Sequence, residues 1–237
     1  MKRIIAMVLV LMMSLCVCAF AETEEKGEGV MTYEEYAAAE MDTEVTIEAY
    51  IQDKLSWWQG AASFHAQDMD GAYYIYNLPC TEEEFNDVLT IGAKIKVTGF
   101  KAEWAGEIEI SDASAWEVLE GEYIAEPIDV TELLGTDEIA EKMNMLVSFN
   151  GLTIEEVVEN EGNSFQYGWD GSGSEGDDLY FKANGQTFVV ESYLRGPGTD
   201  VYEAVKALEV GQVVNMTGYL YWYEGAQPHV ISVEIAE

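Results

Sequence analysis

The sequence predicts an all-β protein with short helices, in which one unit of five strands and a helix occurs twice. The first observation is a segment that recurs, at residues 91–106 and at 210–225, with three glycines spaced by seven. The glycines are Gly92, Gly99 and Gly106 in the first copy and Gly211, Gly218 and Gly225 in the second. The middle glycine follows a threonine and precedes an aromatic residue in both copies, at an offset of 119 positions (217 − 98). The second observation is that strand, turn and helix signals come in the same order before each segment.

Alternation and turn residues define the first unit. The expected strands lie at 45–51, 63–68, 72–77, 93–100 and 107–119. Asp70-Gly71 tolerates the positive φ of a tight turn and joins the second and third strands. Thr81 caps a helix expected over 81–89, whose acidic first turn suits the helix macrodipole. The order is β-β-β-α-β-β.

The second unit repeats this order after a connector. The expected strands lie at 146–154, 178–183, 186–193, 211–222 and 227–235. Asn184-Gly185 is a strong signal for a two-residue hairpin turn. The helix is expected over 199–208, and a polar, glycine-rich excursion occupies 159–178.

Five strands with one helix between the third and the fourth form the arrangement of the OB-fold, a small, partly open barrel. The motifs that carry the resemblance are Gln67-Asp68-x-Asp70-Gly71-x-Tyr73 and Gly92-x-x-Ile95-x-Val97-Thr98-Gly99. They resemble the hairpin and the fourth strand of secreted bacterial OB domains of the nucleic-acid-binding-like type. The second copy departs from this pattern, because its hairpin at 181–185 lacks the Gln-Asp pair. The resemblance implies two five-stranded OB-fold barrels in tandem.

This organisation divides the chain into five segments. They are a signal peptide at 1–21, an acidic leader and short helix at 22–42, a first OB-fold domain at 43–120, a connector at 121–144 and a second OB-fold domain at 145–237.

The first 21 residues have the form of a bacterial signal peptide. Lys2 and Arg3 precede an apolar run at 4–17, and Ala19-Phe20-Ala21 is an A-x-A cleavage site. The apolar run is shorter than the roughly 20 residues of a membrane anchor. We therefore expect a protein secreted to the periplasm, the cell envelope or the exterior, with no stable membrane association after cleavage. Lipid anchoring through a signal-peptide cysteine is less favoured.

The charge and the cysteine content limit the kinds of partner and of covalent cross-link that we expect. The formal net charge is −34, so the chain repels phosphate backbones and favours cations and basic partners. Cleavage would leave Cys80 as the only cysteine, which excludes an internal disulfide. We interpret this cysteine as a small apolar residue.

Aromatic residues fall where OB-folds bind, on the second and third strands and at the flanking loops. The candidates in the first copy are Trp57, Trp58, Tyr74, Tyr76 and Trp104. Those in the second copy are Tyr221, Trp222 and Tyr223, with Tyr167 and Tyr193 as further candidates. Such rings could stack on sugars, bases or apolar side chains. The alternative is that they fill the barrels or the contact between them.

Carboxylates are abundant, but few are grouped in a way that indicates a metal. The candidate ligands are Asp170, Glu175, Asp177 and Asp178, which would suit Ca²⁺ in a glycine-rich loop. Asp68 and Asp70 are interpreted as part of a turn rather than of a calcium loop. His65 and His229 are isolated in the sequence and are interpreted as structural. No catalytic motif is present, so an enzyme is not expected.

We therefore predict an exported, non-catalytic tandem OB-fold protein that contacts its ligand with aromatic loop residues, a sugar or peptide fitting the charge better than nucleic acid. The alternatives are an OB-type protein that binds single-stranded nucleic acid, and a cation-binding or envelope-stress periplasmic protein. The sequence leaves the ligand, the oligomeric state and the relative orientation of the barrels open.

Overall fold

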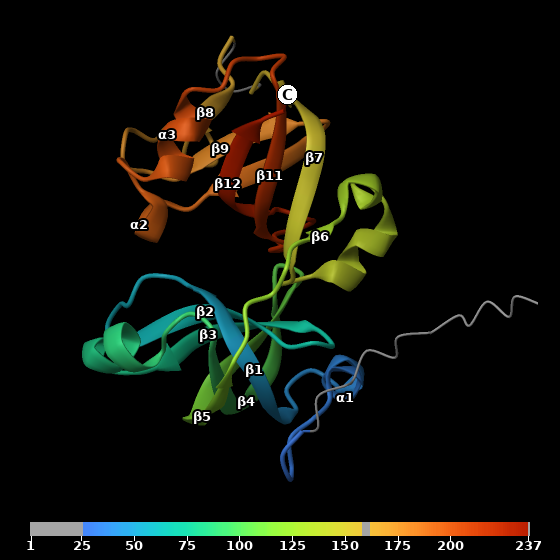
Figure 1. The fold of residues 1–237 in the computed structure, drawn as a ribbon, viewed down its shortest axis with the longest axis vertical. Helices are drawn as coiled ribbons and strands as arrows, with labels where there is room; N and C mark the ends of the chain where they lie inside the picture. The colour runs from blue at the N-terminus through green and yellow to red at the C-terminus, as the bar shows by residue number, and fades with distance from the viewer. Residues whose placement is uncertain (1–25, 158–161, 237) are drawn as a thin grey trace, which may run out of the picture.

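The computed structural model describes residues 26–157 and 162–236, which form two small β-barrels stacked one above the other (Figure 1). The predicted signal peptide lies outside the described residues. No helix within the described ranges is long and apolar enough to span a membrane.

The first barrel closes around five strands in the order β1-β2-β3-β5-β4. The strands are β1 (Glu44–Lys54), β2 (Ala61–Gln67), β3 (Ala72–Pro79), β4 (Ala93–Trp104) and β5 (Glu107–Glu122). The β3–β5 pair is parallel and the other pairs are antiparallel. A short helix α1 (Tyr33–Ala38) precedes the barrel, and a π-helical turn at Glu84–Val88 joins β3 to β4.

The second barrel repeats this topology and adds short strands. Its ring consists of β7 (Leu146–Glu155), β9 (Leu179–Ala183), β10 (Gln186–Val190), β11 (Val213–Tyr219) and β12 (His229–Ile235). Pairing of β7 with β9 closes the ring, and the β10–β12 pair is parallel, as its counterpart is in the first barrel. The added elements are β6 (Ile128–Asp129), β8 (Phe165–Tyr167), α2 (Ser192–Arg195), α3 (Asp200–Lys206) and 3₁₀ turns at Thr131–Leu133 and Asp137–Lys142. The predicted fold class, two five-stranded OB-type barrels with short helices, is confirmed.

Two local predictions for the second barrel were wrong. The glycine-rich excursion contains β8, which pairs with β9 and extends the sheet. The strand expected to reach Tyr193 ends at Val190, and α2 follows it. The amide of Ser192 donates to Asp178 Oδ1 at 2.7 Å, which turns the chain out of the sheet. This turn brings Tyr193 and Arg195 toward the first barrel.

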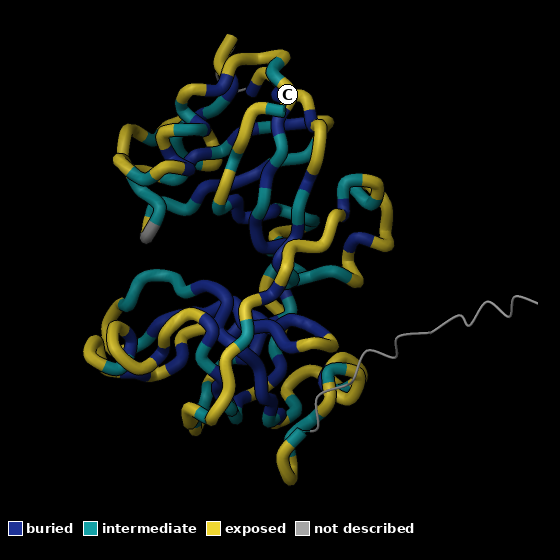
Figure 2. The backbone as a smooth tube through the Cα atoms, viewed as in Figure 1, coloured by how far each residue is buried: buried dark blue, intermediate teal, exposed yellow. Residues whose placement is uncertain are grey.

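Each barrel has its own apolar core (Figure 2). The first is built around Phe64 and Tyr73, the second around Phe149, Phe181 and Phe188, and all five side chains are fully buried. Burial of this kind stabilises a barrel by about 1.5–3 kcal/mol for each large side chain. Each unit therefore buries a core of its own.

The hairpin between β2 and β3 depends on one buried carboxylate. Asp68 Oδ1 accepts hydrogen bonds from the amides of Asp70 (2.8 Å) and Gly71 (2.7 Å). Its Oδ2 accepts from the Tyr73 hydroxyl at 3.2 Å and pairs with Lys26 Nζ at 2.7 Å. The Asp68 oxygens are occupied by the protein, which confirms the turn interpretation.

The middle glycines of the repeat sit where the fourth strand of each barrel bends. The pairing register shifts between Thr98 and Phe100 in β4 and between Thr217 and Gly218 in β11. A Cβ on Gly99 would lie 2.8 Å from the Ser111 carbonyl oxygen, and one on Gly218 would lie 2.3 Å from that of His229. Glycine is required because the neighbouring strand passes too close for a side chain.

We expect Gly218→Ala to lower the free energy of unfolding by about 2–3 kcal/mol, because the new methyl group meets backbone that cannot move without opening the β11–β12 pair. Chemical denaturation measures this loss. Gly211→Ala is the matched control: its φ is +89° and nothing lies within 4 Å of the added Cβ. It should cost only the backbone strain, about 1 kcal/mol. Equal losses in the two variants would contradict the steric explanation.

Candidate ligand-binding site

The barrels meet at the turns in which the repeated glycine segments end. Ala105 (φ 52°) and Glu224 (φ 52°) occupy the left-handed region in the β4–β5 turn and in its counterpart before β12. The Glu224 amide donates to the Ala105 carbonyl at 2.7 Å. The rings of Trp104 and Tyr223, at matching positions of the two turns, lie 5.4 Å apart. The two equivalent turns therefore contact each other.

Stacked rings extend this contact along β2, β3, β11 and β12. His65 stacks on Tyr219 with 4.5 Å between centroids, and Tyr221 stacks on His229 at 4.3 Å. Tyr74 meets Tyr221 edge-on at 5.4 Å. Aromatic pairs of this kind contribute about 0.5–1.5 kcal/mol each beyond their buried area. We call these five residues the aromatic seam.

Polar contacts fix the orientation of the seam. The Tyr219 hydroxyl donates to the Gln52 carbonyl at 2.9 Å, and the Leu146 amide donates to Gln67 Oε1 at 3.0 Å. Arg195 in α2 reaches across to Asp53 in β1, with 2.5 Å between Nη2 and Oδ2. These contacts join residues that are far apart in the sequence and hold the two barrels together.

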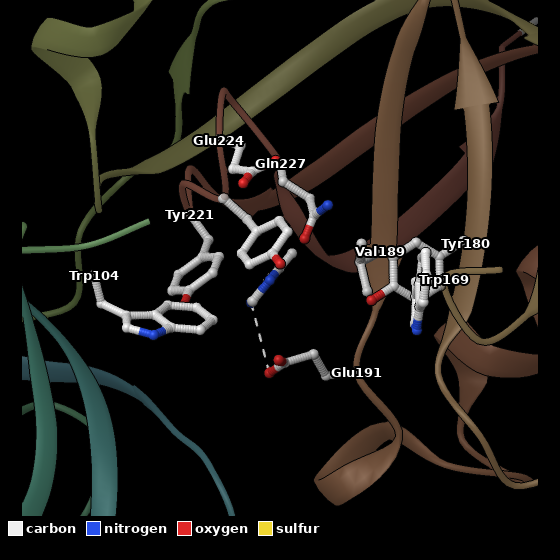
Figure 3. Close-up of a pocket in the computed structure, with 10 residues that line it drawn as sticks. Trp104, Trp169, Tyr180, Val189, Glu191, Tyr221, Glu224 and Gln227 are labelled. Carbon is white, nitrogen blue, oxygen red and sulfur yellow. Dashed lines mark ion pairs between the residues drawn. The ribbon is translucent and has the colours of Figure 1, made fainter. Parts of the chain in front are cut away.

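A cavity of about 530 Å³ opens beside the seam, and we call it the inter-barrel cavity. Its lining residues are Trp104, Trp169, Tyr180, Val189, Glu191, Tyr221, Tyr223, Glu224, Gln227 and His229. Figure 3 shows Trp104 and Tyr221 on one side, Trp169 and Tyr180 on the other, and Glu191 between them. Only Trp104 comes from the first barrel, so the cavity depends on how the two barrels meet.

A second cavity of about 610 Å³, the Trp58 cavity, lies on the other side of Glu191. Its lining residues are Leu55, Ser56, Trp58, Ser63, Tyr74, Tyr76, Asn77, Glu191 and Tyr193. Glu191 therefore lines both cavities.

Glu191 and His229 face each other, with 3.5 Å between Oε2 and Nδ1. Burial raises the pKa of Glu191 to about 8, and the nearby Asp178 carboxylate adds to the shift. Burial also lowers the pKa of His229 to about 3, with a further contribution from the charge of Arg195. The distance would suit an ion pair, yet both shifts favour the neutral forms. We therefore interpret this contact as an uncharged pair at pH 7.

The eight predicted aromatic residues divide into two groups. Six line one of the two cavities: Trp58, Tyr74, Tyr76, Trp104, Tyr221 and Tyr223. Trp58 and Trp104 are 72% and 54% exposed. The other two line neither cavity. The Trp57 indole packs against the first core and donates to the Cys80 carbonyl at 2.8 Å. Trp222 packs against the second core and covers Gly106.

Sequence reasoning missed several cavity residues, of which four bear on the site. Trp169, 77% exposed, stands in the glycine-rich excursion, where a tryptophan without an apolar neighbour was a usable signal. Tyr180 alternates with the buried Phe181 along β9 and so points away from the core. Glu191 and His229 gave no signal, because they meet only when the strands pack. The isolated His229 was interpreted as structural, and it does support the seam.

The four carboxylates considered for Ca²⁺ do not converge. Asp170 accepts from Ser172, and Asp177 accepts from the amide of Ser174. Asp178 accepts from Ser192, while Glu175 pairs with Lys206 Nζ at 2.8 Å. Among the described residues, no group of three or more His, Cys, Asp or Glu side chains is placed to hold a metal ion.

No family model matches the chain, and no curated protein matches it in sequence. Among solved structures, a murine DNA-binding protein bound to double-stranded DNA gives a TM-score of 0.37 at 11% identity, over 81% of this chain and 96% of that one. The hypothetical protein ygiW from E. coli gives 0.29 at 20% identity, over 38% and 89%. The asparaginyl-tRNA synthetase of Entamoeba histolytica gives 0.32 at 19% identity, over 37% of this chain and only 23% of the synthetase. At these TM-scores the likenesses do not bear on function, and the OB-type assignment rests on the strand pairings.

Replacing Arg195 tests the contact between the barrels. We expect Arg195→Gln to lower the free energy of unfolding by about 1–2 kcal/mol, because Asp53 stays largely buried without its cation. Burial already raises the pKa of Asp53 despite Arg195, and the variant should raise it further. Lys96→Gln, which breaks the exposed pair with Glu117, is the matched control and should cost less than about 0.5 kcal/mol. Denaturation curves at pH 7 compare them, and an effect no larger than that of the control would contradict this role.

The raised pKa of Glu191 also predicts how stability depends on pH. The folded protein holds this proton up to pH about 8, whereas an unfolded glutamate releases it near 4.3. The stabilisation is complete below the unfolded pKa and is lost as pH rises through the folded one. We expect Glu191→Gln to reduce the fall in unfolding free energy between pH 7 and 9 by about 1–2 kcal/mol. Glu107, whose pKa burial also raises to about 8, should leave a residual slope. Identical slopes in variant and wild type would show that Glu191 is already ionised.

Proposed function

We propose that this chain is a non-catalytic binding protein whose ligand, a sugar or a peptide, lies in the inter-barrel cavity. The observation that carries the proposal is the gathering of exposed rings from both barrels around one cavity, with Trp104 on one side and Trp169 on the other. Exposed aromatic surface of this kind marks binding sites in soluble proteins.

The polar groups of the cavity support this reading. Gln227, Glu224 and the hydroxyls of Tyr180 and Tyr223 are interspersed with the rings. Such groups orient a polar ligand while the aromatic faces supply most of its contact area. The predicted export to the periplasm, envelope or exterior is part of the proposal and would place such a ligand outside the cytoplasm.

Single-stranded nucleic acid remains the alternative, because aromatic rings also stack on bases. Phosphate binding needs free cations, and the described basic side chains are largely engaged within the protein. Carboxylate partners hold Lys26, Lys94, Lys96, Arg195 and Lys206. Backbone carbonyls accept from Lys54 and Lys101. With a net charge of −34, these contacts favour a sugar or peptide.

The inter-barrel cavity can be tested by titrating the full chain with oligosaccharide and peptide libraries while following tryptophan fluorescence. We expect Trp104→Ala and Tyr223→Ala to weaken binding by about 5–30-fold, because each removes a ring that borders the cavity. Phe100→Ala is the control: this exposed ring lies in β4 and lines neither cavity. Unchanged affinity in the Trp104 and Tyr223 variants would place the ligand elsewhere.

The same titration with a single-stranded oligonucleotide distinguishes nucleic-acid binding from sugar or peptide binding. Binding at low salt that weakens steeply between about 50 and 200 mM salt would favour nucleic acid.

Calcium binding by the glycine-rich loop is tested by thermal unfolding. If the loop binds Ca²⁺, the melting temperature in calcium should be higher than in chelator. An unchanged melting temperature would contradict calcium binding.

A further inference from the structure

Building on the function proposed above, we propose that the inter-barrel cavity recognises a protonated amine, the side chain of a lysine in a peptide. The nitrogen binds the Glu191 carboxylate beside His229, with aromatic rings around it. This assigns a ligand class to the cavity and a specificity role to two residues that hold no established one.

Two acceptors face the same point of the cavity. Glu191 Oε2 and His229 Nδ1 lie 3.5 Å apart, and both residues line the cavity. His229 is 9% exposed, and its Nδ1 has no hydrogen-bond partner among the described residues. A buried nitrogen without a partner is uncommon and calls for an explanation. An ammonium group carries three donors, so one nitrogen can donate to the Glu191 carboxylate and, once that carboxylate turns away from His229, also to Nδ1.

The histidine is suited to accept rather than to donate. Burial holds the pKa of His229 at about 3, so its ring is neutral at physiological pH. A neutral imidazole keeps a lone pair on one nitrogen. With the proton on the other nitrogen, Nδ1 presents its lone pair toward Glu191 Oε2.

The charges around Glu191 leave room for one more cation. Asp178 and Asp53 are acidic, and Arg195 is the basic group that acts on Glu191. Arg195 is already paired with Asp53 at 2.5 Å. Among the described residues that line the cavity, none is lysine or arginine. A ligand cation would therefore meet acidic groups without displacing a cation of the protein.

The rings complete the environment of an amine. Trp104 and Tyr221 stand on one side of Glu191, and Trp169 and Tyr180 stand on the other (Figure 3). The faces of such rings attract cations, most strongly for tryptophan. The aliphatic stem of a lysine would pack against the same rings while its nitrogen reaches the acceptors. A neutral sugar would gain the stacking but would bring no positive charge to favour the ionised form of Glu191.

The test compares three peptides with the full chain by isothermal titration calorimetry at pH 8 and low salt. They are acetyl-Gly-Lys-Gly-amide and the same peptide with acetyl-lysine or norleucine in place of lysine. We expect the lysine peptide to bind about tenfold more tightly than the other two. Glu191→Gln, which keeps the shape of the side chain, should abolish this preference. Glu209→Gln, which removes an exposed carboxylate outside the cavity, should retain it.

A second readout needs no variant. A cation beside Glu191 favours its carboxylate, so binding near pH 7 should release a proton and lower a pKa that stands at about 8 in the free protein. The affinity for the lysine peptide should therefore rise from pH 6 to 8.5, since the amine itself stays protonated to about 10.4. The binding heat should differ between phosphate and Tris buffers.

The outcomes separate the two proposals. Trp104-dependent binding of an oligosaccharide or uncharged peptide, with no preference for lysine and no proton release, would overturn the amine and leave the cavity as the binding site. Lysine-peptide binding that neither Trp104→Ala nor Glu191→Gln weakens would place the site elsewhere and overturn both. A preference for lysine that survives in Glu191→Gln would overturn the assigned role of that carboxylate.

Discussion

The inter-barrel cavity depends on the aromatic seam, because its walls come from two barrels that each fold around a separate core. The stacks of His65 on Tyr219 and of Tyr221 on His229 set the distance between the barrels. The ion pair of Arg195 with Asp53 adds a second contact between the barrels. Interfaces between the domains of one chain are often small and allow motion. Here the seam joins stacked rings with a largely buried ion pair, a combination that favours one arrangement and so keeps Trp104 opposite Trp169.

Two acids with raised pKa values lie near this seam, and their surroundings give them different roles. Burial raises the pKa of both Glu107 and Glu191 to about 8. Glu107 is fully buried, and its Oε2 accepts a hydrogen bond from the Trp222 amide at 2.8 Å. The protein itself therefore replaces part of the hydration that this carboxyl group loses on burial. Glu191 opens onto two cavities and faces a histidine that stays neutral. Of these two acids, only Glu191 is placed for a ligand to stabilise its charged form.

The fold could be predicted from the sequence because its signals are local and occur twice. The bends at Gly99 and Gly218, the Asp68 turn and the Asn184-Gly185 hairpin each depend on a few neighbouring residues. The site was only partly predictable. Adjacent tryptophans in a loop cannot easily both be buried, and indeed Trp57 packs on the core while Trp58 is exposed.

The rest of the site was not predictable, because it is formed by contacts between distant segments. His229 is one strand residue among many until β12 packs beside the seam, and its role depends on Glu191, 38 positions earlier (229 − 191). The chain leaves the sheet after Val190 because Asp178, which is distant in the sequence, accepts a hydrogen bond from the Ser192 amide. Without that turn Arg195 would not reach the first barrel.

The repeat also explains why the contact between the barrels is symmetric in one place and asymmetric elsewhere. Trp104 and Tyr223 are separated by the repeat offset of 119 (223 − 104), and their turns contact each other directly. A contact between equivalent surfaces is the kind that a two-fold dimer of one barrel would make. The next equivalent pair breaks the symmetry: Tyr219 is 3% exposed in the seam, whereas Phe100 is 38% exposed (219 − 100 = 119). Only the second copy thus contributes its fourth strand to the seam, and the inter-barrel cavity opens beside the symmetric turn contact.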